Sequence, residues 1–274
     1  MNTIVVPTDF SKCALQALRA AAKFARKSDA AIKLYHCYER PIYGFVDLTV
    51  DSQKNTKIIK SLQAKLRKLM NRDFMKGINV SAALLPDVSI DKLYKRDSIK
   101  NADLIVIGSH GASGWKEKII GSNAEKMVRY AKPPVMVIKD GAKDFKMDKV
   151  VFASDFNREI DSVFARLKKL FNLYNSKIEL LRVVTPKHFN NTDDCMTKMD
   201  EFARKFYLDN YSKNVYNAES IEDGILAFAK NKNVDVITLE THGRTGFSHI
   251  LAGSIAEDIA NHAKRPILSV RMLT

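Results

Sequence analysis

Several patterns that often reveal a protein's chemistry are missing from this chain. Its 274 residues include three cysteines, at positions 13, 37 and 195, without a Cys-x-x-Cys pair or a metal-site spacing. No apolar run approaches the roughly 18–20 residues that cross a bilayer, and no Walker A sequence occurs. These absences exclude a disulfide scaffold, a cysteine-based zinc site, a transmembrane helix and a Walker-type nucleotidase.

The beginning of the sequence and its cysteines bear on the cellular compartment. Residues 1–4 lead directly into a predicted strand and lack the layout of a signal peptide. Three cysteines without a pairing pattern suit a reducing environment. We therefore expect a cytoplasmic protein that has no membrane partner.

Positive charge is concentrated in the first half of the chain. The net charge is +14, and residues 1–143 hold 26 Lys and Arg against 13 Asp and Glu, whereas residues 144–274 hold 19 against 18. A positive field raises the local concentration of a polyphosphate ligand. Cations such as Lys57, Lys60 and Lys68 equally suit the solvated face of a helix. Because no basic strand interleaved with aromatics and no recognition-helix motif occurs, we expect no nucleic-acid partner.

Glycines follow a predicted buried strand in the first half. The apolar run at 104–107 leads into Gly108-Ser109-His110-Gly111, then nine residues, then Gly121-Ser122-Asn123. A helix is predicted from residue 123, with Ser122 as its cap. Backbone N–H groups at glycines and at a helix N-terminus bind anions, and open α/β sheets bind ligands at strand carboxyl ends. The pattern favours a phosphate site, although such glycines alone are also typical of plain turns.

The second half repeats this pattern. An apolar run at 234–239 precedes His242-Gly243, nine residues and Gly253-Ser254. Both halves end alike, in Ala-Lys-Pro-Pro (131–134) and Ala-Lys-Arg-Pro (263–266), and begin alike, in Pro-Thr-Asp-Phe (7–10) and Ala-Ser-Asp-Phe (153–156). A single fold duplicated along the chain explains the repeat, and two copies are too few for a solenoid.

Hydrophobic patterning predicts five strands in each half, separated by helices. Strands are expected at 3–7, 31–38, 78–84, 104–107 and 135–139, and at 149–153, 177–184, 214–216, 234–239 and 267–271. Helices are expected at 14–26, 56–75, 90–99 and 123–130. This alternation is typical of an α/β fold with a parallel sheet covered on both faces. Because the linker at 140–146 is short, the halves should pack together.

An aspartate follows the first predicted strand, in Pro7-Thr8-Asp9. A carboxylate at this place can accept hydrogen bonds from ribose hydroxyls. Its alternative role is to cap the following helix, a role for which Ser11 is an equal candidate.

With these residues the chain resembles a tandem member of the universal stress protein family over nearly its whole length. Nucleotide-binding members of that family carry Gly-x2-Gly-x9-Gly-[Ser/Thr] after the fourth strand and an aspartate after the first. Gly108, Gly111, Gly121 and Ser122 fill the motif, and Asp9 fills the aspartate position. The resemblance implies two tandem five-stranded parallel-sheet domains, Rossmann-like and similar to adenine nucleotide alpha hydrolases, at 1–140 and 147–274. It also implies a pseudo-dimer in which the strands at 135–139 and 267–271 pair.

The resemblance further implies an adenine nucleotide, ATP with or without Mg²⁺, as the ligand. It places Cys37 and Ile107 against the adenine. The residues expected to bind the nucleotide are Pro7, Thr8, Asp9, Cys37, Ile107, Gly108, His110, Gly111, Gly121, Ser122 and Asn123. We expect no catalytic residue and no metal ligand from the protein, and a homodimer of the tandem chain is left open.

The second half departs from the motif at one position, because Glu240 stands where the first half has Gly108. A carboxylate there repels phosphate, and its side chain obstructs close approach to the backbone. We therefore expect no triphosphate site in this half. The alternative is that Glu240 turns to solvent and a weaker site survives.

Three functions fit these observations. The first is an ATP-binding stress-response sensor or switch without robust catalysis. The second is a scaffold that binds no nucleotide, in which the glycines only shape turns. The third is a slow ATPase or phosphotransferase, with at most weak ATP hydrolysis. Nucleotide released from denatured, purified protein would separate the first from the second.

Overall fold

The computed structural model describes residues 1–274 except 41–47, 112–119, 142–143, 157–159, 242–257 and 273–274. The repeat of the glycine motif from His242 to Ser254 therefore lies outside the described residues. The remaining residues define the strands, most of the helices and the two strands that join the halves.

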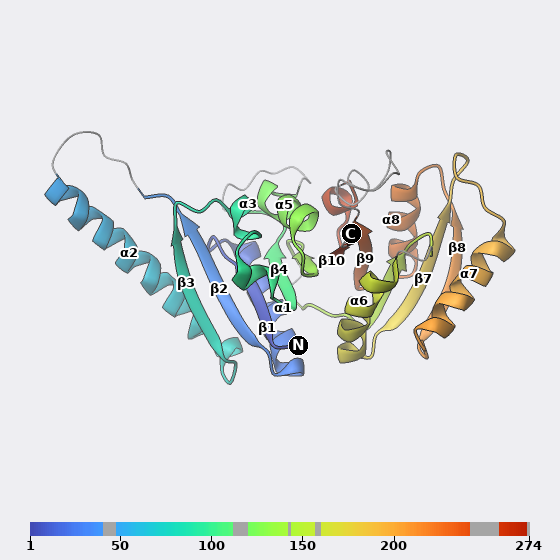
Figure 1. Cartoon of the computed structure of the whole chain (residues 1–274), viewed down its shortest axis with the longest axis horizontal. Coiled ribbons are helices and arrows are strands. Elements are labelled where there is room, and N and C mark those ends of the chain that lie inside the picture. Colours follow the sequence, from blue (N-terminus) through green and yellow to red (C-terminus); the bar gives the residue numbers. More distant parts are fainter. Residues whose placement is uncertain (41–47, 112–119, 142–143, 157–159, 242–257, 273–274) are drawn as a thin grey trace.

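One continuous sheet runs through both halves of the chain (Figure 1). Its strands are β1 (Thr3–Pro7), β2 (Ala31–Tyr38), β3 (Val80–Pro86), β4 (Leu104–Gly108), β5 (Val135–Ile138), β6 (Lys149–Ala153), β7 (Lys177–Val184), β8 (Tyr211–Asn217), β9 (Val236–Thr241) and β10 (Ile267–Arg271). Their order is β3-β2-β1-β4-β5-β10-β9-β6-β7-β8. Within each half the neighbouring strands are parallel. The predicted α/β fold of two tandem domains is confirmed.

The two halves join through an antiparallel pair of their last strands. Val137 lies opposite Ile267 and Met136 opposite Leu268. This pairing, which the family resemblance implies, removes the sheet edge that each half would otherwise expose. The linker residue Phe145 packs against the first half. Its ring lies 5.3 Å from that of Phe24, and its carbonyl accepts a hydrogen bond from Lys23 Nζ at 2.9 Å.

Helices cover both faces of the sheet (Figure 1). They are α1 (Lys12–Ser28), α2 (Leu48–Met70), α3 (Ile90–Leu93), α4 (Asp97–Lys100), α5 (Ser122–Tyr130), α6 (Asp161–Tyr174), α7 (Thr192–Lys205), α8 (Ile221–Asn231) and the 3-10 turn η1 (Asp73–Met75). Residues 258–262 are also helical. One core layer includes buried residues of α1, α2, α6 and α7, and the other includes residues of α3, α4, α5 and α8. Both layers extend through the two halves, so the chain has a shared core on each face.

The first helix shows how the sequence defines an element. Ser11 is its N-cap, because Ser11 Oγ accepts a hydrogen bond from the Ala14 N–H at 3.1 Å. Ala17, Ala21 and Phe24 are fully buried on the side that faces the sheet. The helix ends at Asp29, whose left-handed backbone directs its N–H to the Ala25 carbonyl. Of the two candidate caps, Ser11 performs the role, which leaves Asp9 outside the helix.

Two predicted helices differ from the observed ones. The stretch predicted as one helix at 90–99 is two short helices, because Arg96 adopts an extended backbone between them. The helix predicted to reach residue 75 ends at Met70, since Arg72 is also extended. The predicted strand at 214–216 is longer, spanning Tyr211–Asn217. As an edge strand it admits polar residues, which weaken the apolar pattern on which the prediction relied.

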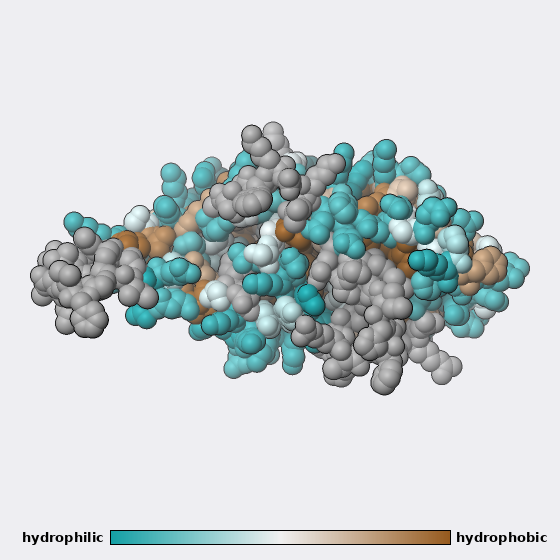
Figure 2. Space-filling model, turned by 90° about the horizontal axis from the view of Figure 1, so that it is seen from above, coloured by the Kyte–Doolittle hydropathy of each residue, from teal (hydrophilic) through white to brown (hydrophobic). Residues whose placement is uncertain are grey.

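The outer surface agrees with the charged composition. Figure 2 shows mainly hydrophilic side chains on the face seen from above, with hydrophobic residues in strips between them. Phe189 and Tyr207 are large apolar side chains that are nevertheless strongly exposed. Within the described part of the chain, no helix has the length and apolarity needed to cross a membrane.

Placing proline in β5, one of the two strands that join the halves, should lower the free energy of unfolding. Val137 is fully buried in a strand that pairs on both sides, so proline removes a ladder hydrogen bond whichever neighbour receives it. We expect Val137→Pro to be less stable than Val137→Ala, which keeps the N–H, by about 1–3 kcal/mol, the cost of a buried carbonyl left without its hydrogen bond. Urea unfolding of the full-length variants measures the difference. Equal stability of the two variants would contradict the role of this ladder.

Candidate functional site

A small cavity lies at the carboxyl ends of β1 and β4, next to the start of α5. It is lined by Pro7, Thr8, Asp9, Ala14, Ile107, Gly108, Ser109, His110, Gly111, Gly121, Ser122, Asn123 and Ala124. The structure thus brings together every predicted site residue except Cys37. The cavity measures about 100 Å³, below the roughly 300 Å³ at which small-molecule pockets usually begin. These residues alone therefore enclose a group the size of a phosphate.

The turn after β1 fixes the position of Asp9. Thr8 Oγ1 accepts a hydrogen bond from the Phe10 N–H at 3.1 Å, and Asp9 Oδ1 accepts one from the Ser11 N–H at 2.9 Å. Phe10 has a left-handed backbone, with φ of 66°, a conformation that is costly for a bulky residue. The second half repeats the turn, with φ of 58° at Phe156 and a 3.1 Å hydrogen bond from its N–H to Ser154 Oγ.

Two of the glycines allow close contacts within the protein. A Cβ at Gly108 would lie 2.8 Å from the backbone carbon of Cys13, so glycine lets α1 start directly against the end of β4. A Cβ at Gly111 would lie 2.9 Å from Asp9 Oδ2, so glycine there admits the carboxylate. The two predicted parts of the site, the aspartate and the glycine loop, are therefore in immediate contact.

The start of α5 presents unused hydrogen-bond donors to the cavity. Gly121 is the N-cap, and Ser122 is the first helical residue, so the prediction that Ser122 caps the helix is wrong. The Gly121 N–H donates to the Ser109 carbonyl at 2.6 Å, and the Ala124 N–H donates to the Gly121 carbonyl at 2.9 Å. Between them, the N–H groups of Ser122 and Asn123 have no hydrogen-bond partner among the described residues. Free amides at a helix N-terminus are suited to hydrogen-bond an anion.

Ser109 and His110 form one wall of the cavity. Ser109 is fully buried, and its N–H donates to the Ile138 carbonyl at 2.9 Å. Ser109 Oγ lies 2.9 Å from His110 Nδ1, which holds the imidazole in place. The site prediction omitted Ser109, Ala14 and Ala124. Only the position of Ser109 within the glycine motif could have indicated its role, since the two alanines carry no distinctive chemistry.

Cys37 lies apart from this cavity. It is half-buried on β2, opposite Leu85 of β3, and packs against the core. Burial raises the pKa of its thiol to about 11, against a smaller opposite effect of Arg96. The thiol is therefore protonated at neutral pH. Its predicted contact with adenine stays a prediction.

Glu240 occupies the corresponding place in the second half. It is the penultimate residue of β9, and its Oε1 accepts a hydrogen bond from Ser154 Oγ at the end of β6, at 3.1 Å. The other carboxylate oxygen, Oε2, is buried. The alternative that Glu240 turns to solvent is wrong. The second half therefore has a carboxylate beside Ser154 where the first half has a glycine packed against the start of α1.

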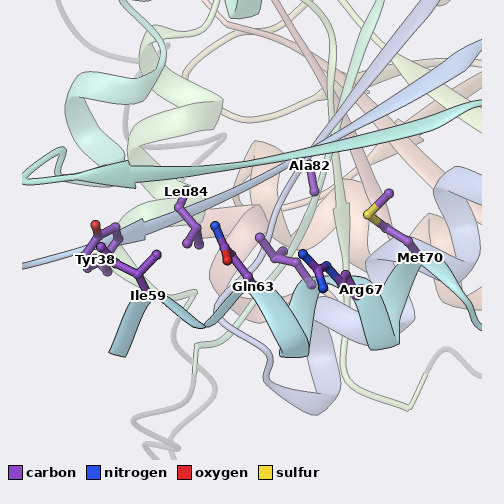
Figure 3. Close-up of a pocket in the computed structure, with 8 residues that line it drawn as sticks. Tyr38, Ile59, Gln63, Arg67, Met70, Ala82 and Leu84 are labelled. Carbon is purple, nitrogen blue, oxygen red and sulfur yellow. The ribbon is translucent and has the colours of Figure 1, made fainter. Parts of the chain in front are cut away.

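A larger cavity of about 440 Å³ lies between α2 and strands β2 and β3 (Figure 3). It is lined by Tyr38, Ile59, Gln63, Leu66, Arg67, Met70, Ala82 and Leu84. Figure 3 shows Ala82 and Leu84 on the sheet facing Gln63, Arg67 and Met70 on the helix. This lining is largely apolar and includes no glycine and no helix N-terminus. The glycines and the helix N-terminus expected of a phosphate site therefore lie at the smaller cavity and not at this one.

Cations at the ends of the joining strands bind the opposite half. Lys139, directly after β5, donates to the Ala260 carbonyl, and Arg271 at the end of β10 donates to the Tyr130 carbonyl at 3.3 Å. Both carbonyls belong to the last turn of a helix, where intrahelical partners are lacking. Lys139 is 5% exposed, and burial lowers its pKa to about 8.

Acidic and thiol groups do not gather into a metal site in the described ranges. No group of three or more His, Cys, Asp or Glu side chains is placed to hold a metal ion there. The site's chemistry in these ranges consists of amide donors, hydroxyls, one imidazole and one carboxylate.

A duplicated α/β sheet with a glycine-lined cavity at the carboxyl ends of two strands defines the class of this protein. The model of the universal stress protein family matches residues 1–139 and again 146–271. The chain belongs to the universal stress protein family.

Related proteins agree with this assignment. Universal stress protein MJ0531 of Methanocaldococcus jannaschii is 30% identical over 146 residues, which cover 52% of this chain and 84% of that protein. Universal stress protein MJ0577 of the same organism is 25% identical over 151 residues, covering 50% and 93%. The crystal structure of a universal stress protein from Archaeoglobus fulgidus matches with a TM-score of 0.74 and 18% identity over 99% of both chains. The last similarity shows that the fold of both halves is shared.

The buried Lys139 should make stability depend on pH. Below about pH 8 the lysine is charged in both the folded and the unfolded chain, so the folded state bears the full free-energy cost of burying a charged amine. Between about 8 and 10.5 the unfolded chain holds a proton that the folded chain lacks, so the free energy of unfolding rises with pH. Lys139→Met lacks this effect.

We therefore expect the stability advantage of Lys139→Met over the wild type to shrink by up to about 3 kcal/mol across this pH range. Comparing the two proteins cancels the other titrating groups. Denaturant titrations at several pH values provide the measurement, and a difference independent of pH would contradict the buried position of this amine.

Proposed function

We propose that the first half of this universal stress protein binds ATP, and that binding makes the chain a stress-response sensor or switch without robust catalysis. The carrying observation is the pair of free N–H groups at Ser122 and Asn123, which face a cavity bordered by Asp9. Phosphate oxygens accept hydrogen bonds from such amides, and the helix dipole favours their charge. The glycine motif that carries these amides is the one typical of the family's nucleotide-binding members.

The nucleotide would lie across the carboxyl ends of β1 and β4. Its phosphates occupy the start of α5, with the Ser122 hydroxyl as a further donor. Asp9 is positioned to accept hydrogen bonds from the ribose, because its turn and Gly111 hold the carboxylate at the cavity wall. The adenine extends past Ile107 toward Cys37, outside the small cavity. The 100 Å³ enclosed by the described residues suits the phosphate end of this ligand.

The composition of the cavity supports binding over turnover. Phosphoryl transfer needs positive charge on the transferred group, usually from a lysine, an arginine or a metal ion. The described residues that line the cavity include no lysine and no arginine. His110 is engaged with Ser109 instead of a carboxylate that would orient it as a base.

The second half contributes no nucleotide site in this proposal. Glu240 places negative charge and side-chain bulk where the first half has glycine, and Ser154 holds it there. We expect one nucleotide per chain. The proposed domains extend over 1–140 and 147–274, in a cytoplasmic protein whose three free cysteines suit reducing conditions.

Asn123→Asp provides a sharp test of phosphate binding at α5. The change adds one negative charge beside the free amides while favouring the helix dipole, so the fold keeps its stability. We expect the affinity for ATP to fall about tenfold or more through repulsion of the phosphates. Isothermal titration calorimetry on the full chain measures affinity and stoichiometry.

Asn191→Asp is the matched control, because Asn191 caps α7 in the second half and the substitution makes the same charge change at a helix start. It should leave ATP affinity unchanged. An equal loss in both variants would contradict the assigned site. A wild-type protein that binds no ATP would favour the scaffold, and phosphate release that depends on Asp9 would favour a slow ATPase.

Removing magnesium should have a modest effect. The described cavity supplies amides and a hydroxyl, and Asp9 is its single carboxylate, whereas protein Mg²⁺ sites use one or two carboxylates together with substrate phosphates. We expect EDTA to lower the ATP affinity by less than about tenfold. Titrations with and without MgCl₂ measure the change, and complete loss of binding in EDTA would contradict the prediction.

A further inference from the structure

The second half reaches into the phosphate-binding turn of the first. Asn261 Oδ1, on the helical residues 258–262, accepts a hydrogen bond from the Ile120 N–H at 2.8 Å. Ile120 directly precedes Gly121 and Ser122, and it is 3% exposed. In the part of the chain that the structure describes, no first-half residue accepts a hydrogen bond from this amide.

This contact completes a turn that is held from two sides. The Ile120 N–H is bound by the second half, and the next amide, that of Gly121, is bound by the Ser109 carbonyl at 2.6 Å. The two amides that follow, at Ser122 and Asn123, are the free donors of the phosphate site. Their direction is set by the two bound peptides before them, because successive peptide planes share their Cα atoms.

A second contact anchors the same helical segment. Lys139 Nζ donates to the carbonyl of Ala260, the residue before Asn261. Lys139 follows Ile138, whose carbonyl accepts the N–H of Ser109. The segment carrying Asn261 is therefore attached to the first half at two consecutive residues, both close in the fold to the glycine motif. Neither attachment exists unless β5 and β10 are paired.

We infer that Asn261 is a positioning residue of the first-half site: the second half, whose own motif is altered at Glu240, orients the phosphate donors of the first. This inference rests on the proposed ATP binding. It gives the second half a role in ligand binding that needs no ligand of its own. The ligand is an anion with terminal phosphate oxygens, which accept hydrogen bonds from the N–H groups of Ser122 and Asn123.

The test uses full-length variants of nearly equal shape. Asn261→Leu removes the acceptor, and Asn261→Asp keeps an acceptor oxygen. His262→Ala is the control, because His262 lies on the same helical segment and contacts Glu222 within the second half. Hydrogen exchange at the Ile120 amide is measured without nucleotide, and ATP affinity is measured by calorimetry.

We expect Asn261→Leu to accelerate exchange at Ile120 and to weaken ATP binding about five- to tenfold, the effect of one lost hydrogen bond. Asn261→Asp should restore protection of Ile120, and His262→Ala should change neither quantity. Unchanged exchange at Ile120, or faster exchange with unchanged ATP affinity, would overturn the inference. If the wild type binds no ATP, the proposed function fails. The difference in hydrogen exchange at the Ile120 amide between Asn261→Leu and Asn261→Asp then still decides whether Asn261 orders the turn.

Discussion

The antiparallel pairing of β5 with β10 is the contact on which the rest of this structure depends. It converts two five-stranded sheets into one, brings α5 against β10 and brings the helical residues 258–262 against Lys139. Lys139 and Arg271 then satisfy carbonyls that a helix end leaves unpaired. Because both core layers extend through the pairing, neither half has a hydrophobic core that is independent of its partner.

Two glycines of the motif are required by the packing of the protein itself, whether or not a ligand is bound. Gly108 allows α1 to begin against β4, and Gly111 allows the Asp9 carboxylate to approach the loop. A side chain at either position would displace the protein's own atoms before it met a phosphate. The second half tolerates Glu240 because Ser154, at the end of the neighbouring strand, receives its carboxylate. The same position is therefore a close backbone contact with α1 in one half and a polar side-chain contact with Ser154 in the other.

Much of this arrangement could be predicted from the sequence, because it follows from local patterns and from the repeat. Apolar runs located β1, β2, β6, β7 and β10 at their observed bounds, and the glycine motif indicated most of the cavity lining. The sequence could not predict the helix breaks at Arg96 and Arg72, because they depend on tertiary packing. It could not predict the full length of β8, because an edge strand admits polar residues. Asn261 was not predictable, because 141 residues separate it from Ile120 and neither residue type marks a site.

The left-handed phenylalanine after the first strand of each half has a consequence for how such chains are interpreted. Phe10 and Phe156 adopt the same backbone, and each donates its N–H to the hydroxyl two residues earlier, although the halves differ in carrying Gly108 and Glu240. The Thr/Ser-Asp-Phe signature is thus a marker of ancestry and of fold. A motif search that weights this signature will score both halves of a duplicated chain alike, whereas the residue after the fourth strand's apolar run, Gly108 or Glu240, distinguishes them.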